Sequence, residues 1–216
     1  MFIMTIHAYH EIYLSNTQSM LGDAFDYAIN DCDITGDIFI KLFVTSSVSK
    51  RIEKGETAYL SGKSGIEAAR DVLSETMQKN DLPEPSVNYS RSCEYWIGWA
   101  IAYYQWHSCR TFGEIFKAIT FADLTKLYGT LHEADISKFT DLMDQRCKEA
   151  FPETNLKRIR TTYGCTQAEL AKWSGVSLRS IQMYEQRGKN INKASVDTLY
   201  AISRVLGCSM EDLMEF

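Results

Sequence analysis

The sequence lacks the features that mark several large classes of protein. It holds three prolines and twelve glycines in 216 residues, with few alternating strand-like runs. Because strong helix formers such as Leu, Ala, Glu, Lys and Met are plentiful, an all-β architecture is excluded. The longest aromatic-rich apolar run, residues 95–106, is far shorter than the about 20 residues of a membrane-spanning helix. The composition, 45% apolar, therefore predicts a mainly helical protein with a sizeable core.

Cysteine pairs and targeting signals are also missing. The six cysteines, at positions 32, 93, 109, 147, 165 and 208, form no Cys-x-x-Cys pair, and a chain of this length does not need disulfides to fold. The first residues contain no basic segment followed by an apolar stretch and a cleavage site. We therefore expect reduced thiols and a cytoplasmic location.

Charge is distributed unevenly along the chain. The formal net charge is −5, but residues 1–150 carry 14 Lys and Arg against 21 Asp and Glu, whereas residues 151–216 carry 9 against 7. Residues 156–193 hold eight basic residues and only two acidic ones, Glu169 and Glu185, which favours contact with a polyanion. Pro152 disfavours helix continuation from Ala150. These features predict an acidic helical domain over residues 1–150, which binds a partner, oligomerises or senses, and a second domain over 151–216.

The second domain contains regularly spaced helix signals. Thr166 and Glu169 have the spacing of a capping box, and Ser177 and Ser209 are further candidate caps. Glycines at 164, 175, 188 and 207 are placed to end helices. Together these signals predict five short helices in about sixty residues.

The second and third of these helices, residues 167–173 and 178–186, have the spacing of a helix-turn-helix, in which the second helix enters a major groove. The apolar residues recur at helical spacing and are expected to close one core. That core comprises Leu156, Ile159, Leu170, Ala171, Val176, Ile181, Leu199, Ile202, Leu206 and Leu213. This arrangement leaves Arg179, Ser180 and Met183 facing outward.

The motif Thr166-Gln167-x-Glu169-Leu170-Ala171, followed by Gly175-Val176-Ser177, Ile181 and Tyr184-Glu185, resembles the Cro/lambda-repressor (XRE) family of DNA-binding domains. The resemblance covers roughly residues 153–216. It implies that Gln167 contacts phosphate and orients the third helix, and that Ser177, Leu178, Arg179 and Met183 face base edges. It also implies a structural pair between Arg160 and Glu185.

The chemistry of these side chains agrees with roles on DNA. An arginine near the start of a recognition helix can bind the O6 and N7 atoms of guanine, whereas Leu178 and Met183 can only contact thymine methyls or sugars. The connection after the third helix is basic and is expected to bind phosphates. The predicted DNA-binding residues are Gln167, Ser177, Leu178, Arg179, Ser180, Met183, Arg187, Lys189, Asn192 and Lys193.

Residues 1–150 match no catalytic or cofactor motif. Helices are expected at about 11–30, 36–50, 65–79, 93–109, 111–118, 121–127 and 133–150. Residues 94–106 are apolar on nearly every face, which predicts the central helix of a bundle; an aromatic platform for a ligand or peptide is the alternative.

Metal and nucleotide sites are not indicated in residues 1–150. Neither His7 and His10 nor Cys93, His107 and Cys109 have the spacing of a known zinc site. Residues 62–65 lack a complete phosphate-loop motif, and their expected role is the first turn of a helix. We therefore expect no metal, no cofactor and no enzyme activity.

Three functions remain in competition. The first is a transcriptional repressor that binds double-stranded DNA as a homodimer on a palindromic operator. The second is an antitoxin whose acidic domain neutralises a toxin while the second domain represses the shared operon. The third is an enzyme with an appended DNA anchor, which requires convergent titratable groups in the first domain.

Overall fold

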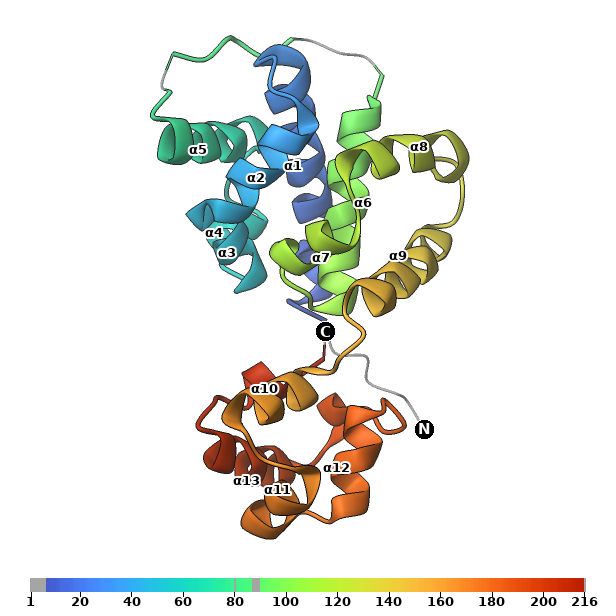
Figure 1. Cartoon of the computed structure of the whole chain (residues 1–216). Coiled ribbons are helices and arrows are strands. Elements are labelled where there is room, and N and C mark those ends of the chain that lie inside the picture. Colours follow the sequence, from blue (N-terminus) through green and yellow to red (C-terminus); the bar gives the residue numbers. More distant parts are fainter. Residues whose placement is uncertain (1–6, 80, 87–89, 216) are drawn as a thin grey trace. The chain divides into compact units, whose positions relative to one another are not determined.

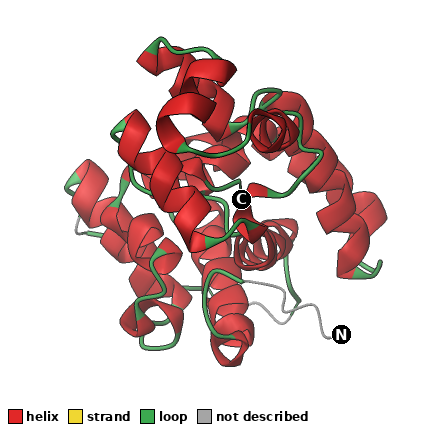
Figure 2. Cartoon of the chain, turned by 90° about the horizontal axis from the view of Figure 1, so that it is seen from below, coloured by secondary structure: helices red, strands yellow, loops and turns green. Residues whose placement is uncertain are grey.

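The computed structural model describes residues 7–79, 81–86 and 90–215. The chain divides into two compact units, Met1–Ala150 and Phe151–Phe216. Every regular element in the described residues is a helix, as the composition predicts (Figure 2). None of the described helices is long and apolar enough to cross a membrane.

The N-terminal unit is built around two helices that lie side by side, α1 (Leu14–Asp26) and α6 (Cys93–Ser108) (Figure 1). A 3₁₀ turn, η1 (Glu11–Tyr13), precedes α1, and a π-helical turn, η2 (Tyr27–Asp31), follows it. The other helices are α2 (Gly36–Thr45), α3 (Ser47–Glu53), α4 (Thr57–Leu60), α5 (Gly65–Met77), α7 (Phe112–Ala118), α8 (Phe121–Leu131) and α9 (Ile136–Ala150).

Helix α6 is the central helix predicted from its apolar sequence. Ten of its residues are buried, among them Trp96, Ile101 and Tyr104. Helix α1 contributes Leu21 and Phe25 to the same core. Because both helices bury side chains on several faces, the shorter helices pack around them and cover the core from water.

The helix expected over residues 36–50 is wrong as a single element, because the chain breaks at Ser46. The backbone of Ser46 is extended (φ −70°, ψ 163°), which separates α2 from α3. Both carboxylate oxygens of Glu75, on α5, accept hydrogen bonds from the Ser47 backbone N–H at 2.8 and 2.9 Å. A residue 28 positions away thus caps α3 and favours the break.

Other helix limits also differ from the sequence expectations. Helix α4 was not anticipated, and α8 continues to Leu131 rather than ending near Leu127. Helix α9 begins at Ile136 instead of Glu133, because Asp135 Oδ1 accepts the Ser137 N–H at 2.9 Å and so caps the first turn.

The C-terminal unit contains the five expected helices, the last as a 3₁₀ turn. These are α10 (Asn155–Tyr163), α11 (Gln167–Ser174), α12 (Leu178–Glu185), α13 (Val196–Leu206) and η4 (Glu211–Leu213), with an additional turn, η3 (Ile191–Lys193). All ten predicted core residues are buried or packed against this core. Gly164, Gly175 and Gly207 end their helices with positive φ angles, the conformation that glycine adopts without steric cost.

Gly188 does not end α12, contrary to the sequence expectation. The helix ends at Glu185, and the residue with left-handed backbone is Arg187 (φ 55°). Gly188 instead provides space, since a Cβ atom there would lie 2.6 Å from the Cε of Met183.

Candidate nucleic-acid interface

Local capping sets the relation between α11 and α12. Thr166 Oγ1 accepts the Glu169 N–H at 3.2 Å, and Glu169 Oε2 accepts the Thr166 N–H at 2.8 Å, which completes the capping box of α11. Gly175 then ends α11, and Ser177 Oγ accepts the Ser180 N–H to begin α12. Only three residues, 175–177, separate the two helices, which is the short connection of a helix-turn-helix.

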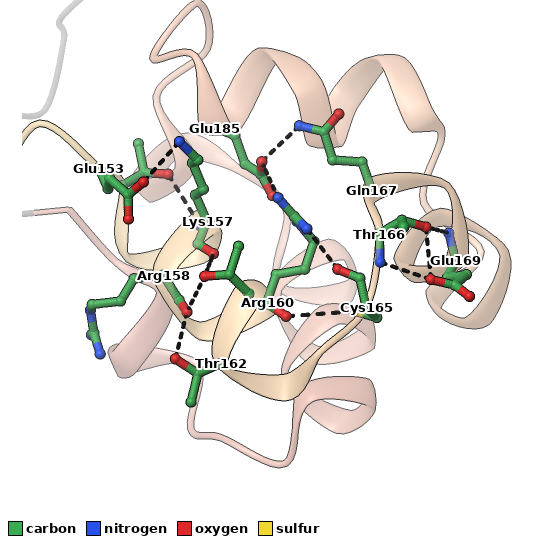
Figure 3. A network of polar contacts seen from close by, with 12 residues as sticks. Glu153, Lys157, Arg158, Arg160, Thr162, Cys165, Thr166, Gln167, Glu169 and Glu185 are labelled. Atoms are coloured by element: carbon green, nitrogen blue, oxygen red, sulfur yellow. Dashed lines mark hydrogen bonds and ion pairs between the residues drawn. The ribbon is translucent and has the colours of Figure 1, made fainter.

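A buried ion pair joins α10 to α12 (Figure 3). Arg160 Nε donates to Glu185 Oε1 at 2.5 Å, and Nη2 donates to Oε2 at 3.0 Å. Only 10% of the Arg160 side chain and 2% of the Glu185 side chain are exposed. Hydrogen bonding to Glu185 raises the pKa of the Arg160 guanidinium. The structure therefore brings together the two residues assigned to a structural pair.

Gln167 extends this pair to α11. Its Nε2 atom donates to Glu185 Oε2 at 2.7 Å, so one carboxylate receives side chains from two other helices (Figure 3). An amide nitrogen carries two hydrogens, and this bond uses one of them. Gln167 is half-buried at the start of α11, where the second hydrogen is left for another acceptor.

The first turn of α12 carries the residues expected to face bases. Arg179 is exposed, and within the described residues its side chain makes no hydrogen bond or ion pair. Leu178 beside it is 40% exposed. The hydroxyls of Ser177 and Ser180 lie 2.9 Å apart and bond to each other. Arg179 is consequently the long side chain of this turn with open donors.

Met183 is less outward than the sequence indicates. Its side chain is half-buried, and its methyl group packs over Gly188 at the end of α12. Only part of the Met183 side chain therefore remains available to contact another molecule.

Arg187 was expected at a phosphate, but the structure uses its guanidinium inside the unit. Nη1 donates to the Pro152 carbonyl at 3.0 Å, Nη2 donates to the Phe151 carbonyl at 2.9 Å, and Nη2 also contacts Glu215 at 3.2 Å. The side chain thus holds the segment that enters the unit against the loop that follows α12.

Asn192 is engaged in a similar way. Its Oδ1 accepts the Glu215 N–H at 2.8 Å, and its Nδ2 donates to the Glu215 carbonyl. Asn155 donates its Nδ2 to the Met214 carbonyl at 2.6 Å. We call residues 151–155, Arg187, Asn192, Met214 and Glu215 the terminal clasp. No local pattern could reveal it, because its partners lie 23 to 60 positions apart.

Not all of the basic residues between 156 and 193 are therefore available to an external anion. Arg160 and Arg187 pair with Glu185 and Glu215, and Lys157 pairs with Glu153 at 2.9 Å. The exposed basic residues without an ion pair in the described structure are Arg158, Lys172, Arg179, Lys189 and Lys193. Three of these five, Arg179, Lys189 and Lys193, lie on α12 or in the connection that follows it.

Among the described residues, no group of three or more His, Cys, Asp or Glu side chains is placed to hold an ion. His7 stacks on Trp106, with ring centroids 3.6 Å apart. Ser64 caps α5 in a capping box with Glu67, so of residues 62–65 only Gly65 lies within the helix and the other three lead into it.

Comparison with known proteins agrees with the geometry of the C-terminal unit. Residues 156–213 match the family model described as "Helix-turn-helix", of the XRE type, and no family model matches the N-terminal unit. No curated protein and no solved structure matches the chain. The C-terminal unit is therefore a helix-turn-helix domain of the kind found in DNA-binding regulators.

Proposed function

We propose that the chain is a transcriptional repressor that binds a palindromic operator as a homodimer, with α12 in the major groove. The observation that carries this proposal is the exposure of Leu178 and Arg179 at the start of α12, in a domain that matches a helix-turn-helix family. Arg179 projects from that turn without an internal partner among the described residues. It has the donor geometry that binds guanine in the major groove.

The contacts divide into base recognition and phosphate binding. Arg179 recognises a base, and Leu178 with the exposed part of Met183 contacts thymine methyls or sugars. Ser177 and Ser180 lie at the same turn, and their proposed role is to contribute hydroxyl contacts to the bases. Gln167, Lys189 and Lys193 bind phosphates, which gives affinity that depends on salt rather than on sequence. Arg187 and Asn192 act instead by holding the terminal clasp.

The short recognition helix supports a dimer, and the charge of the N-terminal unit supports a role for that unit away from DNA. Helix α12 has eight residues and can contact only a few base pairs, so two half-sites one helical turn apart are needed for a long operator. The N-terminal unit has a net charge of −7 and is repelled by DNA. Its proposed part is to bring two chains together, to bind a partner, or to sense a signal.

The test is binding of the full chain to DNA from its own promoter, measured by fluorescence anisotropy at several salt concentrations. We expect tighter binding to promoter DNA than to a shuffled duplex of the same length, with an affinity that falls steeply as salt rises. Footprints should cover two half-sites. Equal affinity for both duplexes, or an affinity independent of salt, would contradict the proposal.

An antitoxin is a second candidate, favoured by the acidic N-terminal unit. A net charge of −7 on 150 residues can complement a basic, nucleic-acid-binding site on a toxin. Co-expression with the product of the adjacent gene should then yield a stable complex and relieve growth arrest. If no small reading frame adjoins this gene, or if the two products do not associate, the antitoxin role is excluded.

A further inference from the structure

The N-terminal unit has a pocket of about 340 Å³ beside the start of α6 and the end of α8. This volume lies within the range of sites that bind small organic molecules. Aromatic rings form most of the wall: Tyr95, Trp96 and Trp99 from α6, and Tyr128 from α8. The pocket belongs to the unit for which the sequence contained no motif.

The rings are held in fixed orientations. Tyr95 and Trp96 are buried in the core, and Trp96 meets Tyr128 edge to face, with centroids 5.7 Å apart. Tyr128 in turn stacks on His132 with centroids 4.5 Å apart, and His132 Nδ1 is 2.7 Å from the Tyr128 carbonyl. Trp99 is only half-buried. Rigid rings around an open space favour a flat, aromatic guest that stacks or meets them edge to face.

The charge of the wall selects the sign of the guest. Arg91 lies over the Tyr95 ring, with its Cζ 4.6 Å from the centroid, and is exposed at the pocket. Among the described residues its guanidinium makes no hydrogen bond or ion pair. None of the described residues that line the pocket carries a carboxylate. A cationic guest would meet Arg91, whereas a carboxylate could form two charge-assisted hydrogen bonds with it.

Two carboxylates of α1 lie near Arg91 outside the wall. Asp26 is engaged, because its Oδ1 accepts from Ser92 at 2.5 Å and from Asn30 at 2.8 Å. Asp23 has a raised pKa, caused first by burial and second by Asp26, and the charge of Arg91 opposes that shift. The attraction of Arg91 to Asp23 acts through space without a hydrogen bond, so within the described part of the chain the guanidinium donors stay open.

We propose that this pocket binds a small planar aromatic carboxylate. The ring lies among Trp96, Trp99 and Tyr128, and the carboxylate binds the Arg91 guanidinium. The inference does not depend on the proposed DNA binding, since it concerns the N-terminal unit and is tested without DNA.

The test is isothermal titration of the full chain with 2-naphthoate, compared with its neutral isostere 2-naphthamide. We expect saturable binding of 2-naphthoate with one site per chain, and affinity for 2-naphthamide weaker by about ten-fold or more, because the amide cannot pair with Arg91. A lack of binding at 5 mM 2-naphthoate, or equal affinity for both compounds, overturns the proposal.

Substitutions of pocket residues show where 2-naphthoate binds. Arg91→Gln should lower the affinity for 2-naphthoate by about ten-fold and leave the affinity for 2-naphthamide unchanged. Trp99→Ala should lower the affinity for both compounds. Arg204→Gln is the matched control, since Arg204 also lies over a tyrosine ring, Tyr200, but in the C-terminal unit. Arg91 is exposed, so its variant should unfold at the wild-type temperature. If Arg91→Gln and Arg204→Gln bind 2-naphthoate equally, the carboxylate is not at Arg91 and the proposal fails.

Discussion

Gly98 of α6 lies directly against the backbone of Leu21 in α1. A Cβ atom at position 98 would come within 2.8 Å of the Leu21 carbonyl carbon and within 3.0 Å of the Gly22 Cα. Real Cβ atoms do not approach backbone so closely, so the two central helices pack at this distance only because position 98 has no side chain.

We therefore expect Gly98→Ala to destabilise the N-terminal unit by about 1–3 kcal/mol, although alanine is the better helix former. Gly129 in α8 is the control, since a Cβ there meets nothing within 4 Å. Gly129→Ala should stabilise by about 0.5–1 kcal/mol. Urea unfolding, monitored by hydrogen exchange of the α6 amides, measures the change in unfolding free energy of both variants. If Gly98→Ala stabilises the protein, α1 and α6 do not pack in such close contact at Gly98.

The buried pair between Arg160 and Glu185 predicts an asymmetry between single and double substitutions. Arg160→Ala leaves the Glu185 carboxylate buried with a lost partner and should cost about 3–5 kcal/mol of the stability of the C-terminal unit. Arg160→Met combined with Glu185→Leu removes both charges and should cost less than half of that. Hydrogen exchange of the α12 amides reports on this unit alone. A single substitution that costs under about 1 kcal/mol would argue against a structural role.

Arg187 combines a strained backbone with a structural side chain. Its φ of 55° is costly for a residue with a Cβ atom, and its guanidinium binds two carbonyls of the entering segment. Arg187→Ala keeps the strain and loses the contacts, whereas Arg187→Gly loses the contacts but relieves the strain. We expect Arg187→Gly to be more stable than Arg187→Ala by about 1 kcal/mol, and both to be less stable than wild type. Thermal unfolding of the two variants checks this order.

The capping box of α11 predicts a dependence of stability on pH. Hydrogen bonds from the Thr166 backbone and hydroxyl lower the pKa of Glu169 below its usual value. The Glu169 carboxylate therefore contributes stability at pH values above its pKa in the unfolded chain, about 4.3. This contribution is lost as the pH falls through the lower pKa of Glu169 in the folded protein. Glu169→Gln keeps a capping side chain without the charge. The stability of α11 should fall less between pH 6 and pH 3 in this variant than in wild type; an identical fall contradicts the assignment.

DNA binding separates the roles of Arg179 and Lys189. Arg179→Ala should cost about 1–3 kcal/mol on the promoter operator and little on shuffled DNA, because a base contact is lost. Lys189→Ala should weaken both equally and reduce the slope of log affinity against log salt by about one. Anisotropy titrations at four salt concentrations give both quantities. If Arg179→Ala weakens the two duplexes equally, Arg179 binds phosphate rather than a base.

The C-terminal unit was largely predictable from the sequence, because its signals act over short distances. A serine or threonine cap contacts an amide two or three residues later, and a glycine ends a helix through its own backbone freedom. Thr166, Ser177 and Gly175 therefore placed α11 and α12 correctly, and the spacing of apolar residues identified the core.

Contacts between distant residues were decided only by the tertiary structure. Glu75 caps α3 at the break in the helix expected over residues 36–50, and Glu215 forms hydrogen bonds with Arg187 and Asn192, two of the residues expected to bind DNA. Nothing near these residues in the sequence indicates a partner that lies 23 or more positions away.

The aromatic pocket shows the same limit. The lack of a polar face identified residues 94–106 as a core helix, but Tyr128 and His132 reach the pocket from α8 and its C-terminal end. Whether an aromatic residue fills the core or lines a cavity depends on how neighbouring helices pack against it, and that is settled by the whole fold. The sequence by itself thus determined the helical class and the helix-turn-helix. The tertiary structure decided which polar side chains bond within the described protein and which remain available to other molecules.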